Sequence, residues 1–220
     1  MRRLIAITQL TLDGVMQAPG GLEEDSRGGF AYGGWAMAFG DEVLGQVITE
    51  TITGDFDMLL GRRTYEIFAA YWPHHDDDPI GKAFNAARKY VASRSLAALD
   101  WAHSHAIAGD AVDGVRRLKT SEGPDLQVWG SGEFLQSLIA AGLVDEYRFW
   151  IVPVLLGKGR RLFTGEIPPG SLTLVGTRAT STGVLINTYR PAGALSPAPV
   201  ESDPASPAEL ARRRRLAAES

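Results

Sequence analysis

The regular alternation of short apolar runs with segments of helical period is the feature that most constrains how this chain folds. In the helical segments, apolar residues recur every three or four positions, as in an amphipathic helix. The apolar runs cover 4–11, 56–61, 89–93, 126–129 and 146–153, and the helical segments cover 43–52, 62–71, 111–119 and 133–141. Strands and helices in alternation are joined by right-handed crossovers, which gives a mostly parallel sheet with helices on both faces.

In the C-terminal part of the chain, two apolar runs follow each other without a helical segment between them. Leu172–Val175 and Val184–Tyr189 flank the turn sequence Ser181–Gly183, which predicts an antiparallel pair of strands. The segment from Pro19 to Gly40 contains seven glycines and is expected to be a long loop. We therefore predict an α/β fold of three layers (α/β/α), in which a mostly parallel mixed sheet ends in a C-terminal antiparallel hairpin.

Composition divides the chain into two parts. Residues 1–190 are predicted to form one folded domain. Residues 191–220 are rich in proline and alanine and have few large apolar side chains, so we expect a disordered tail. Within this tail, Ser206 as N-cap and Pro207 in the first turn allow a short basic helix. The run Arg212–Arg215 is interpreted either as solvated or as a patch for an anionic partner.

Charge and composition exclude several classes of protein. No apolar run approaches the roughly 20 residues that span a bilayer, and the N-terminus lacks a signal-peptide pattern. The net charge of −4 argues against nonspecific nucleic-acid binding, and the lack of cysteine excludes disulfides and thiolate ligands. The run His74–Asp78 is interpreted as a solvated loop, so no metal site is predicted. We expect a cytoplasmic protein that binds a small molecule, has no membrane or nucleic-acid partner, and can form a homodimer.

Three turns that follow predicted strands suit phosphate groups. In open α/β sheets, ligands bind beyond the carboxyl ends of the strands. Gly130–Gly132 precede a helix whose free N–H groups favour an anion, although a tight turn capped by Ser131 explains them equally. The two arginines of Gly61–Thr64 oppose the dipole of the helix that they begin, which favours a ligand over a solvated pair. Ser93–Arg94 can hold a 2′-phosphate.

Six short motifs occur together in one order along the chain. They are Thr11-Leu-Asp-Gly14, Leu60-Gly-Arg-Arg-Thr-Tyr-Glu66, Tyr90-Val-Ala-Ser-Arg94, Val128-Trp-Gly-Ser-Gly-Glu-Phe134, Leu143-Val-Asp-Glu146 and Pro153-Val-Leu-Leu-Gly-Lys-Gly159. Through these motifs, residues 2–190 resemble the dihydrofolate-reductase-like superfamily. The resemblance is greatest to the C-terminal reductase domain of bacterial bifunctional riboflavin-biosynthesis deaminase-reductases. The motifs of the deaminase half, His-x-Glu and Cys-x-x-Cys, do not occur in this sequence.

The resemblance implies an enzyme that binds NADPH without a Rossmann domain. The segment that holds the adenosine-side phosphates is matched by Gly61, Arg62, Arg63 and Thr64. The turn that meets the 2′-phosphate is matched by Ser93 and Arg94. The loop that cradles the pyrophosphate is matched by Gly130, Ser131, Gly132, Glu133 and Phe134. The loop beside the nicotinamide is matched by Thr11, Asp13 and Gly14.

The chain departs from the family at two places. Gln9 stands where many members have alanine against the nicotinamide. The acid that contacts the folate ring in dihydrofolate reductases has no unambiguous counterpart. Asp41 and Glu42 lie nearest in order and are the candidate catalytic residues, although a helix N-cap explains Asp41 equally.

The activity that the resemblance implies is reduction of a small pyrimidine- or pterin-like heterocycle with hydride from the cofactor. An example is the reduction of 5-amino-6-(5-phosphoribosylamino)uracil in riboflavin biosynthesis. The alternatives are dihydrofolate reductase activity, a nucleotide-binding module without turnover, and a self-associating structural protein.

Overall fold

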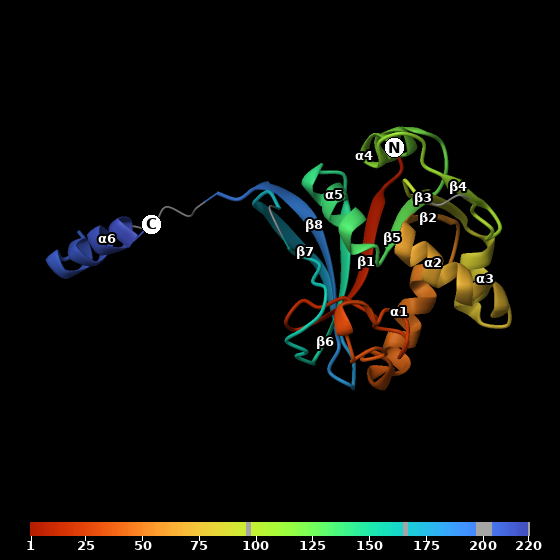
Figure 1. Ribbon diagram of the computed structural model, residues 1–220, viewed down its shortest axis with the longest axis horizontal. Coiled ribbons are helices and arrows are strands. Elements are labelled where there is room, and N and C mark those ends of the chain that lie inside the picture. The colour runs from red at the N-terminus through yellow and green to blue at the C-terminus, as the bar shows by residue number, and fades with distance from the viewer. Residues whose placement is uncertain (96–97, 165–166, 197–203, 220) are drawn as a thin grey trace.

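The computed structural model describes residues 1–95, 98–164, 167–196 and 204–219, and it contains an eight-stranded mixed sheet with helices on both faces (Figure 1). The strands, in chain order, are β1 (Leu4–Thr11), β2 (Phe56–Gly61), β3 (Arg88–Ala92), β4 (Ser104–Ala106), β5 (Asp125–Trp129), β6 (Glu146–Val152), β7 (Gly170–Ala179) and β8 (Leu185–Ala194). The helices are α1 (Glu42–Ile52), α2 (Arg62–Tyr71), α3 (Pro79–Ala86), α4 (Ala111–Thr120), α5 (Gly132–Ala140) and α6 (Pro207–Glu219), with short 3-10 turns at Arg27–Gly29, Met37–Phe39 and Trp72–His74.

The strand order is β4-β3-β2-β5-β1-β6-β8-β7, and the first six strands in this order are mutually parallel. β8 pairs antiparallel with both β6 and β7. The predicted three-layer fold with a C-terminal antiparallel hairpin is therefore confirmed. The carboxyl ends of β1, β2, β3, β5 and β6 lie at one edge of the sheet, which is called the carboxyl edge below.

Apolar side chains hold the layers together on both faces of the sheet. β1 is buried along nearly its whole length because it lies near the centre of the sheet. Alternate β1 residues point to opposite faces. Leu4 and Ala6 pack in the core beneath α4 and α5, whereas Ile5 and Ile7 pack in the core beneath α1 and the loop 14–40. A third cluster, around Phe84, joins α2 and α3 to β2 and β3.

The predicted elements are observed, with differences of one or two residues at most ends. β3 begins one residue earlier than predicted, and α5 includes Gly132. The hairpin strands are longer than predicted, and β8 continues to Ala194, four residues beyond the predicted domain boundary. Two elements were not predicted. One is β4, which has only three residues, and the other is α3, which is capped by the Asp78 carboxylate and begins at Pro79.

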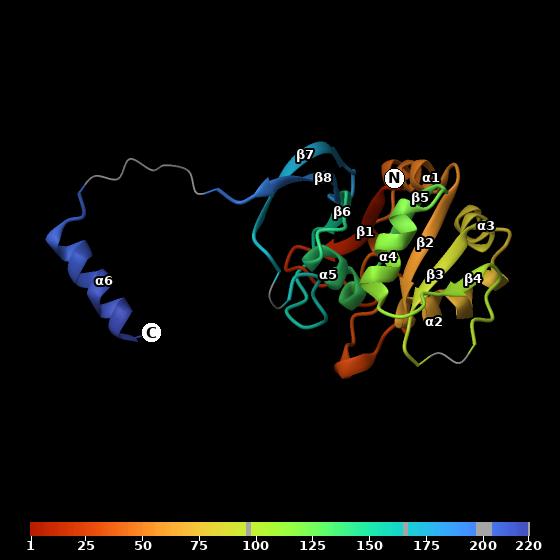
Figure 2. The same ribbon diagram turned by 90° about the horizontal axis from the view of Figure 1, so that it is seen from above.

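The C-terminal helix α6 lies apart from the sheet (Figure 2). The amide of Glu209 donates to the Ser206 hydroxyl at 3.2 Å, as expected of an N-cap, and Glu209 pairs with Arg212 and Arg213. None of its residues is buried. The predicted disorder of the tail falls partly on residues 197–203, which lie outside the described residues. Among the described residues, no helix combines the length and the apolar character that crossing a membrane requires.

Lys89 of β3 is a fully buried lysine on the face covered by α2 and α3. Its ammonium donates to the carbonyl oxygens of Asn85 at 2.9 Å and Ala102 at 3.0 Å, and it lies 4.2 Å from the ring centre of Trp101. Burial lowers the pKa of Lys89 to about 8. The unfolded chain therefore holds this proton more tightly than the folded protein between about pH 8 and pH 10.5.

We predict that the free energy of unfolding rises as the pH increases through this window, because the folded protein has already released the proton that the unfolded chain still binds. The contribution of Lys89 is on the order of 1 kcal/mol between pH 7.5 and pH 9.5. Urea unfolding at these two pH values measures it. Lys89→Met should remove the rise, and Lys82→Met on the exposed side of α3 is the matched control. A rise of the same size in the Lys89→Met protein would contradict the assignment.

Candidate functional site

Ser131 connects the two turns that follow β2 and β5 at the carboxyl edge. Its hydroxyl oxygen accepts a hydrogen bond from the Gly61 amide at 3.0 Å, and the hydroxyl donates to the Trp129 carbonyl at 3.0 Å. The Ser131 amide donates to the Thr64 hydroxyl at 3.1 Å. Ser131 stands at the N-cap position of α5, but its side chain makes no capping bond, so the simple cap that we considered for it is not what the structure shows. The hydroxyl joins two turns instead.

The backbone before α5 is left-handed at two successive residues, Gly130 with φ 55° and Ser131 with φ 51°. Glycine adopts this conformation readily, whereas serine pays a steric cost. At Gly132 the constraint is space rather than φ, because a Cβ there would lie 2.6 Å from the Met16 sulfur and the Met16 side chain would have to shift. Among the described residues, no acceptor contacts the amides of Gly132, Glu133 and Phe134, as is usual in the first turn of a helix. This turn therefore presents three N–H groups and the positive end of the α5 dipole.

Charged side chains surround the beginning of α5. The Glu133 carboxylate contacts Arg63 at 3.2 Å and Arg160 at 2.5 Å. These groups are largely exposed, so the pairs contribute little to stability. Arg62 pairs with Glu66 one turn along α2, at 3.2 Å. The two arginines of α2 thus have carboxylate partners, which an incoming phosphate would compete with.

A small cavity of about 180 Å³ lies between the loop 14–40 and the turn at residues 157–160. Three basic residues line it, Arg27, Lys158 and Arg160, together with Phe30 and the polar side chain of Gln17. Arg160 also contacts Glu133, so the cavity adjoins the first turn of α5. Arg27 also pairs with Asp25, so two of the three positive charges have carboxylate partners and Lys158 carries the remaining one, which suits an anionic group.

Asp13 fastens the end of β1 to the segment that follows β6. Its carboxylate accepts hydrogen bonds from the Thr11 hydroxyl at 2.6 Å, the Leu156 amide at 3.2 Å, the Gly157 amide at 2.8 Å and Arg161 at 3.2 Å. The Thr11 hydroxyl, followed by these amides and Arg161, lowers the pKa of Asp13 to about 2. Asp13 is thus a permanent anion that orders the loops. The left-handed Gly14, with φ 79°, turns the chain directly after it.

In the turn after β3, the Ser93 hydroxyl oxygen accepts from the Ser95 amide at 3.2 Å. Arg94 is exposed, and its guanidinium forms no ion pair with any described residue. Arg94 therefore remains available to an external anion.

Asp41 is the N-cap of α1 and also fixes that helix to the β7–β8 turn. Its carboxylate accepts from the Leu44 amide at 2.8 Å and from the amide and hydroxyl of Ser181 at 2.7 and 2.8 Å. The Leu44 amide, together with Ser181, lowers the pKa of Asp41 below its usual value. The N-cap is therefore observed, and contact of Asp41 with a substrate stays a prediction. Glu42, beside it, is exposed and forms no ion pair within the described chain.

Four buried side-chain atoms have no partner among the described residues. They are the hydroxyls of Thr8 and Ser104, the side-chain oxygen of Gln9 and the indole nitrogen of Trp150. Gln9 and Trp150 are direct neighbours in the parallel pair β1–β6 and point to the face covered by α1. The Trp150 ring also packs edge-to-face against Trp129, the last residue of β5, at 6.2 Å. A buried donor or acceptor without a partner costs about 1–3 kcal/mol, and such groups concentrate at functional sites.

The loop 14–40 forms the wall beside this pair. Val15, Phe30 and Trp35 are buried in the same cluster as Trp150, and the Trp35 indole donates to the Gln17 carbonyl at 2.8 Å. The loop therefore packs as a folded wall over β1. It shields the two unpartnered atoms from water in this conformation.

The structure thus brings together most of the predicted site residues at one edge of the sheet. Those of the turns after β2 and β5 are in direct contact, and those after β1 and β3 flank them. Asp41 and Glu42 lie at the beginning of α1, apart from these turns. The Gln9–Trp150 pair was not predicted as a site, because its pairing depends on strand register. Among the described residues, no group of three or more histidine, aspartate or glutamate side chains is arranged to hold a metal ion.

Comparison with known proteins places this geometry in a family. The family described as the RibD C-terminal domain matches residues 2–186. A curated relative, "Uncharacterized protein YyaP" of Bacillus subtilis (strain 168), is 29% identical over 192 residues, which cover 86% of this chain and 94% of the relative.

Three solved structures share the fold. A putative riboflavin biosynthesis protein from Shewanella sp. PV-4 is similar with a TM-score of 0.64 and 19% identity, over 86% of this chain and 98% of that one. A pyrimidine reductase-like protein from Corynebacterium diphtheriae has a TM-score of 0.56 and 13% identity, over 86% and 92%. The dihydrofolate reductase of Enterococcus faecalis, in complex with NADP(H) and RAB-propyl, has a TM-score of 0.54 and 16% identity, over 86% and 96%.

The left-handed turn at Ser131 gives a prediction about stability. Ser131→Ala and Ser131→Gly both remove the hydroxyl that joins the turns after β2 and β5, so both proteins should unfold at lower urea concentration than the wild type. Only alanine keeps a Cβ in the left-handed conformation, so Ser131→Ala should be the less stable of the two by about 1 kcal/mol. Equal stability of the two variants, or the reverse order, would show that the backbone at Ser131 is not left-handed.

Proposed function

This chain belongs to the RibD C-terminal domain family, and we propose that it is an NADPH-dependent reductase of a small pyrimidine- or pterin-like heterocycle. The observation that carries the proposal is the interlocked pair of turns after β2 and β5. They offer three backbone N–H groups at a helix N-terminus with arginines on both sides. Family membership and the fold shared with an NADP(H)-bound dihydrofolate reductase support the same cofactor.

The lack of a Cβ at Gly132 supports the proposed place of NADPH. The flexible Met16 side chain lies above Gly132, and the proposal requires that it move aside for the phosphate, whereas a Cβ at position 132 could not. The pyrophosphate is proposed to lie on the amides of Gly132–Phe134, with Arg63 and Thr64 beside it. Arg94, which has no ion pair among the described residues, is proposed to hold the 2′-phosphate.

The protein's own contribution to the reaction is alignment and exclusion of water. NADPH, when bound, supplies the hydride. The loop 14–40 forms the wall that keeps water from the reacting atoms, and Asp13 fixes the turn from which that loop begins. Because Asp13 and Asp41 both have lowered pKa values, neither is suited to donate a proton near neutral pH. Proton delivery to the acceptor therefore falls to another group or to water.

The unpartnered atoms of Gln9 and Trp150 define the chemistry of the acceptor. Gln9 offers an acceptor oxygen and Trp150 a donor N–H, side by side on adjacent strands. A ring lactam, with N–H and C=O adjacent, satisfies both, and pyrimidinediones and pterins contain this group. The basic cavity lined by Arg27, Lys158 and Arg160 suits an anionic substituent such as a sugar phosphate on that ring.

The proposed function is tested by following NADPH oxidation at 340 nm with a panel of pyrimidine and pterin acceptors, including 5-amino-6-(5-phosphoribosylamino)uracil and dihydrofolate. NADPH should bind ten- to a hundredfold more tightly than NADH, on the order of one charge-assisted hydrogen bond. Arg94→Ala should abolish this preference, and Arg116→Ala, an exposed arginine on α4, should preserve it. Binding of NADPH without turnover of any acceptor would favour a nucleotide-binding module, and absence of NADPH binding would refute the proposal.

Gly132→Ala tests the phosphate cradle. The added Cβ meets Met16 and occupies the space proposed for a phosphate oxygen, so both stability and NADPH affinity should fall. The double variant Met16→Ala/Gly132→Ala removes the steric conflict and should recover most of the stability. If the cradle binds the pyrophosphate, the double variant still binds NADPH at least tenfold more weakly than Met16→Ala alone, as measured by tryptophan fluorescence. Equal affinity of these two proteins would contradict the cradle.

Gln9→Met tests the acceptor pocket with a side chain of similar size and no hydrogen-bonding group. If Gln9 binds the acceptor, KM for the acceptor should rise about tenfold or more while the Kd for NADPH stays near the wild-type value. The melting temperature should rise under either hypothesis, because the unpartnered oxygen is removed, so an oxygen without function predicts the same gain in stability with an unchanged KM. A change confined to the Kd for NADPH would place Gln9 against the cofactor instead.

A further inference from the structure

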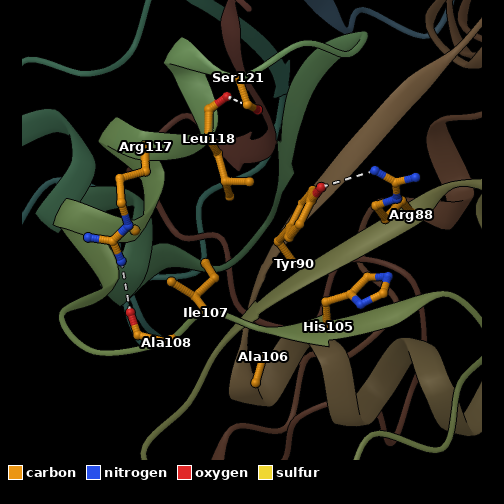
Figure 3. Close-up of a pocket in the computed structure, with 10 residues that line it drawn as sticks. Arg88, Tyr90, His105, Ala106, Ile107, Ala108, Arg117, Leu118 and Ser121 are labelled. Atoms are coloured by element: carbon orange, nitrogen blue, oxygen red, sulfur yellow. Dashed lines mark hydrogen bonds between the residues drawn. The ribbon is translucent and has the colours of Figure 1, made fainter.

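A groove of about 490 Å³ lies on the face of the sheet that α4 covers, between α4 and the edge strands β3 and β4 (Figure 3). None of its lining residues belongs to the turns of the candidate site, and its nearest approach to them is at Ile107, whose amide donates to the Val91 carbonyl of β3 at 2.9 Å. A volume of this size is within the range of small-molecule sites.

The groove exists because too few helices cover this face. α4 packs through Val115 onto β1, β2 and β5, and α5 packs farther toward β6. No described helix lies over β3 and β4 on this side, although their other face is covered by α2 and α3. Parallel strands are normally covered on both faces. The side chains that β3 and β4 present here are therefore partly open to solvent.

The floor of the groove is aromatic and apolar. Tyr90 of β3 and His105 of β4 are neighbours in register, with ring centres 6.0 Å apart and planes tilted by 37°. Ile107 and Leu118 continue the apolar surface and pack on the main core. Planar rings stack favourably on such a floor.

Two arginines flank this floor, and neither has a carboxylate partner among the described residues. Arg88 of β3 donates to the Tyr90 hydroxyl at 3.4 Å, and Arg117 of α4 donates to the Ala108 carbonyl at 3.0 Å. Figure 3 shows the two guanidinium groups on opposite sides of Tyr90 and Ile107. The neighbouring Arg116, by contrast, pairs with Asp113 at 2.8 Å. The buried Asp57, which pairs with Arg2, also acts electrostatically on Arg88, its neighbour in register, whereas Arg117 contacts no carboxylate among the described residues. The groove thus presents two positive charges next to an aromatic surface.

We propose that this groove is a second binding site, for an aromatic anion of mononucleotide size. The ring lies on Tyr90, Ile107 and Leu118, the phosphate meets Arg117, and Arg88 contacts the polar edge of the ring. Charge-assisted bonds from arginine to phosphate and stacking on an aromatic floor are the interactions by which proteins hold such molecules. The proposal does not depend on the proposed reductase activity.

The test uses the fluorescent mononucleotide N-methylanthraniloyl-AMP, titrated into the full-length protein and followed by fluorescence anisotropy. Arg117→Glu and Arg88→Glu should each weaken binding at least tenfold. Arg116→Glu is the matched control, because it makes the same change of charge on the same helix outside the groove, and it should leave the affinity within about twofold. Circular dichroism establishes that each variant is folded.

A competition experiment separates the groove from the carboxyl edge. Millimolar NADP+ should leave the probe bound, and Gly132→Ala should leave its affinity unchanged. Displacement by NADP+, or weakening by Gly132→Ala but not by Arg117→Glu, would place the probe at the candidate cofactor site and overturn the proposal. Absence of binding at millimolar protein and probe, or equal affinity in all three arginine variants, would overturn it as well. None of these outcomes changes the result of the NADPH oxidation assay, so the two proposals fail separately.

Discussion

The buried ion pair between Arg2 and Asp57 fixes how the central strands begin. Both side chains are almost completely buried, at 2% and 8% exposure. The Arg2 guanidinium also donates to the Pro124 carbonyl at 2.6 Å, so one side chain joins the chain before β1 to β2 and to the turn before β5. Loss of one partner of such a pair costs about 3–5 kcal/mol, because the other charge remains buried. This contact sets the stagger of three neighbouring strands.

Other ion pairs act at the same edge of the sheet. Arg3 contacts Asp125 at the beginning of β5, Lys119 contacts Asp145 before β6, and Arg190 of β8 contacts Glu146 at the beginning of β6. Each pair ties the beginning of one strand to a neighbouring element. Arg3 and Arg190 are about half exposed, so their pairs add little stability. The backbone ladders of β5 with β1 and β2 set the register that brings Gly61, Thr64 and Ser131 together at the carboxyl edge.

Much of this arrangement could be predicted from the sequence, because the relevant signals are local. The positions of the strand ends follow from apolar runs that stop at glycine, and Asp41 was recognised as a cap from its place before a helical segment. The helix α3 could also have been found from the pair Asp78–Pro79, which is a typical start of a helix, although the acidic run around it was interpreted as a loop.

The contacts that give the site its chemistry could not be predicted in this way. A cap by Ser131 is one of the two interpretations that the sequence allows for this turn, but the partner of its hydroxyl is Gly61, 70 residues away in sequence. The unpartnered atoms of Gln9 and Trp150 become neighbours only through the register of β1 and β6. The groove beside α4 depends on which strands a helix leaves uncovered. The Ser131–Gly61 contact, the Gln9–Trp150 pair and the groove beside α4 all depend on the order of the strands in the sheet, which no local sequence pattern encodes.

The two edges of the sheet carry different kinds of polar group. Where the strands begin, Arg2 pairs with Asp57, the buried Lys89 contacts only carbonyl oxygens and the Trp101 ring, and the Ser104 hydroxyl has no partner among the described residues. Near the carboxyl edge, Ser131 is left-handed, Gln9 and Trp150 lack partners, and the first amides of α5 have no acceptor among the described residues. Each of these features costs stability, and together they persist only because the rest of the sheet over-determines its register. A ligand with phosphates and a lactam would satisfy the amides and the unpartnered pair at once. Binding of such a molecule would supply partners for the α5 amides and for Gln9 and Trp150, although it would leave the left-handed backbone at Ser131 unchanged, and for this reason we propose the carboxyl edge as the binding site.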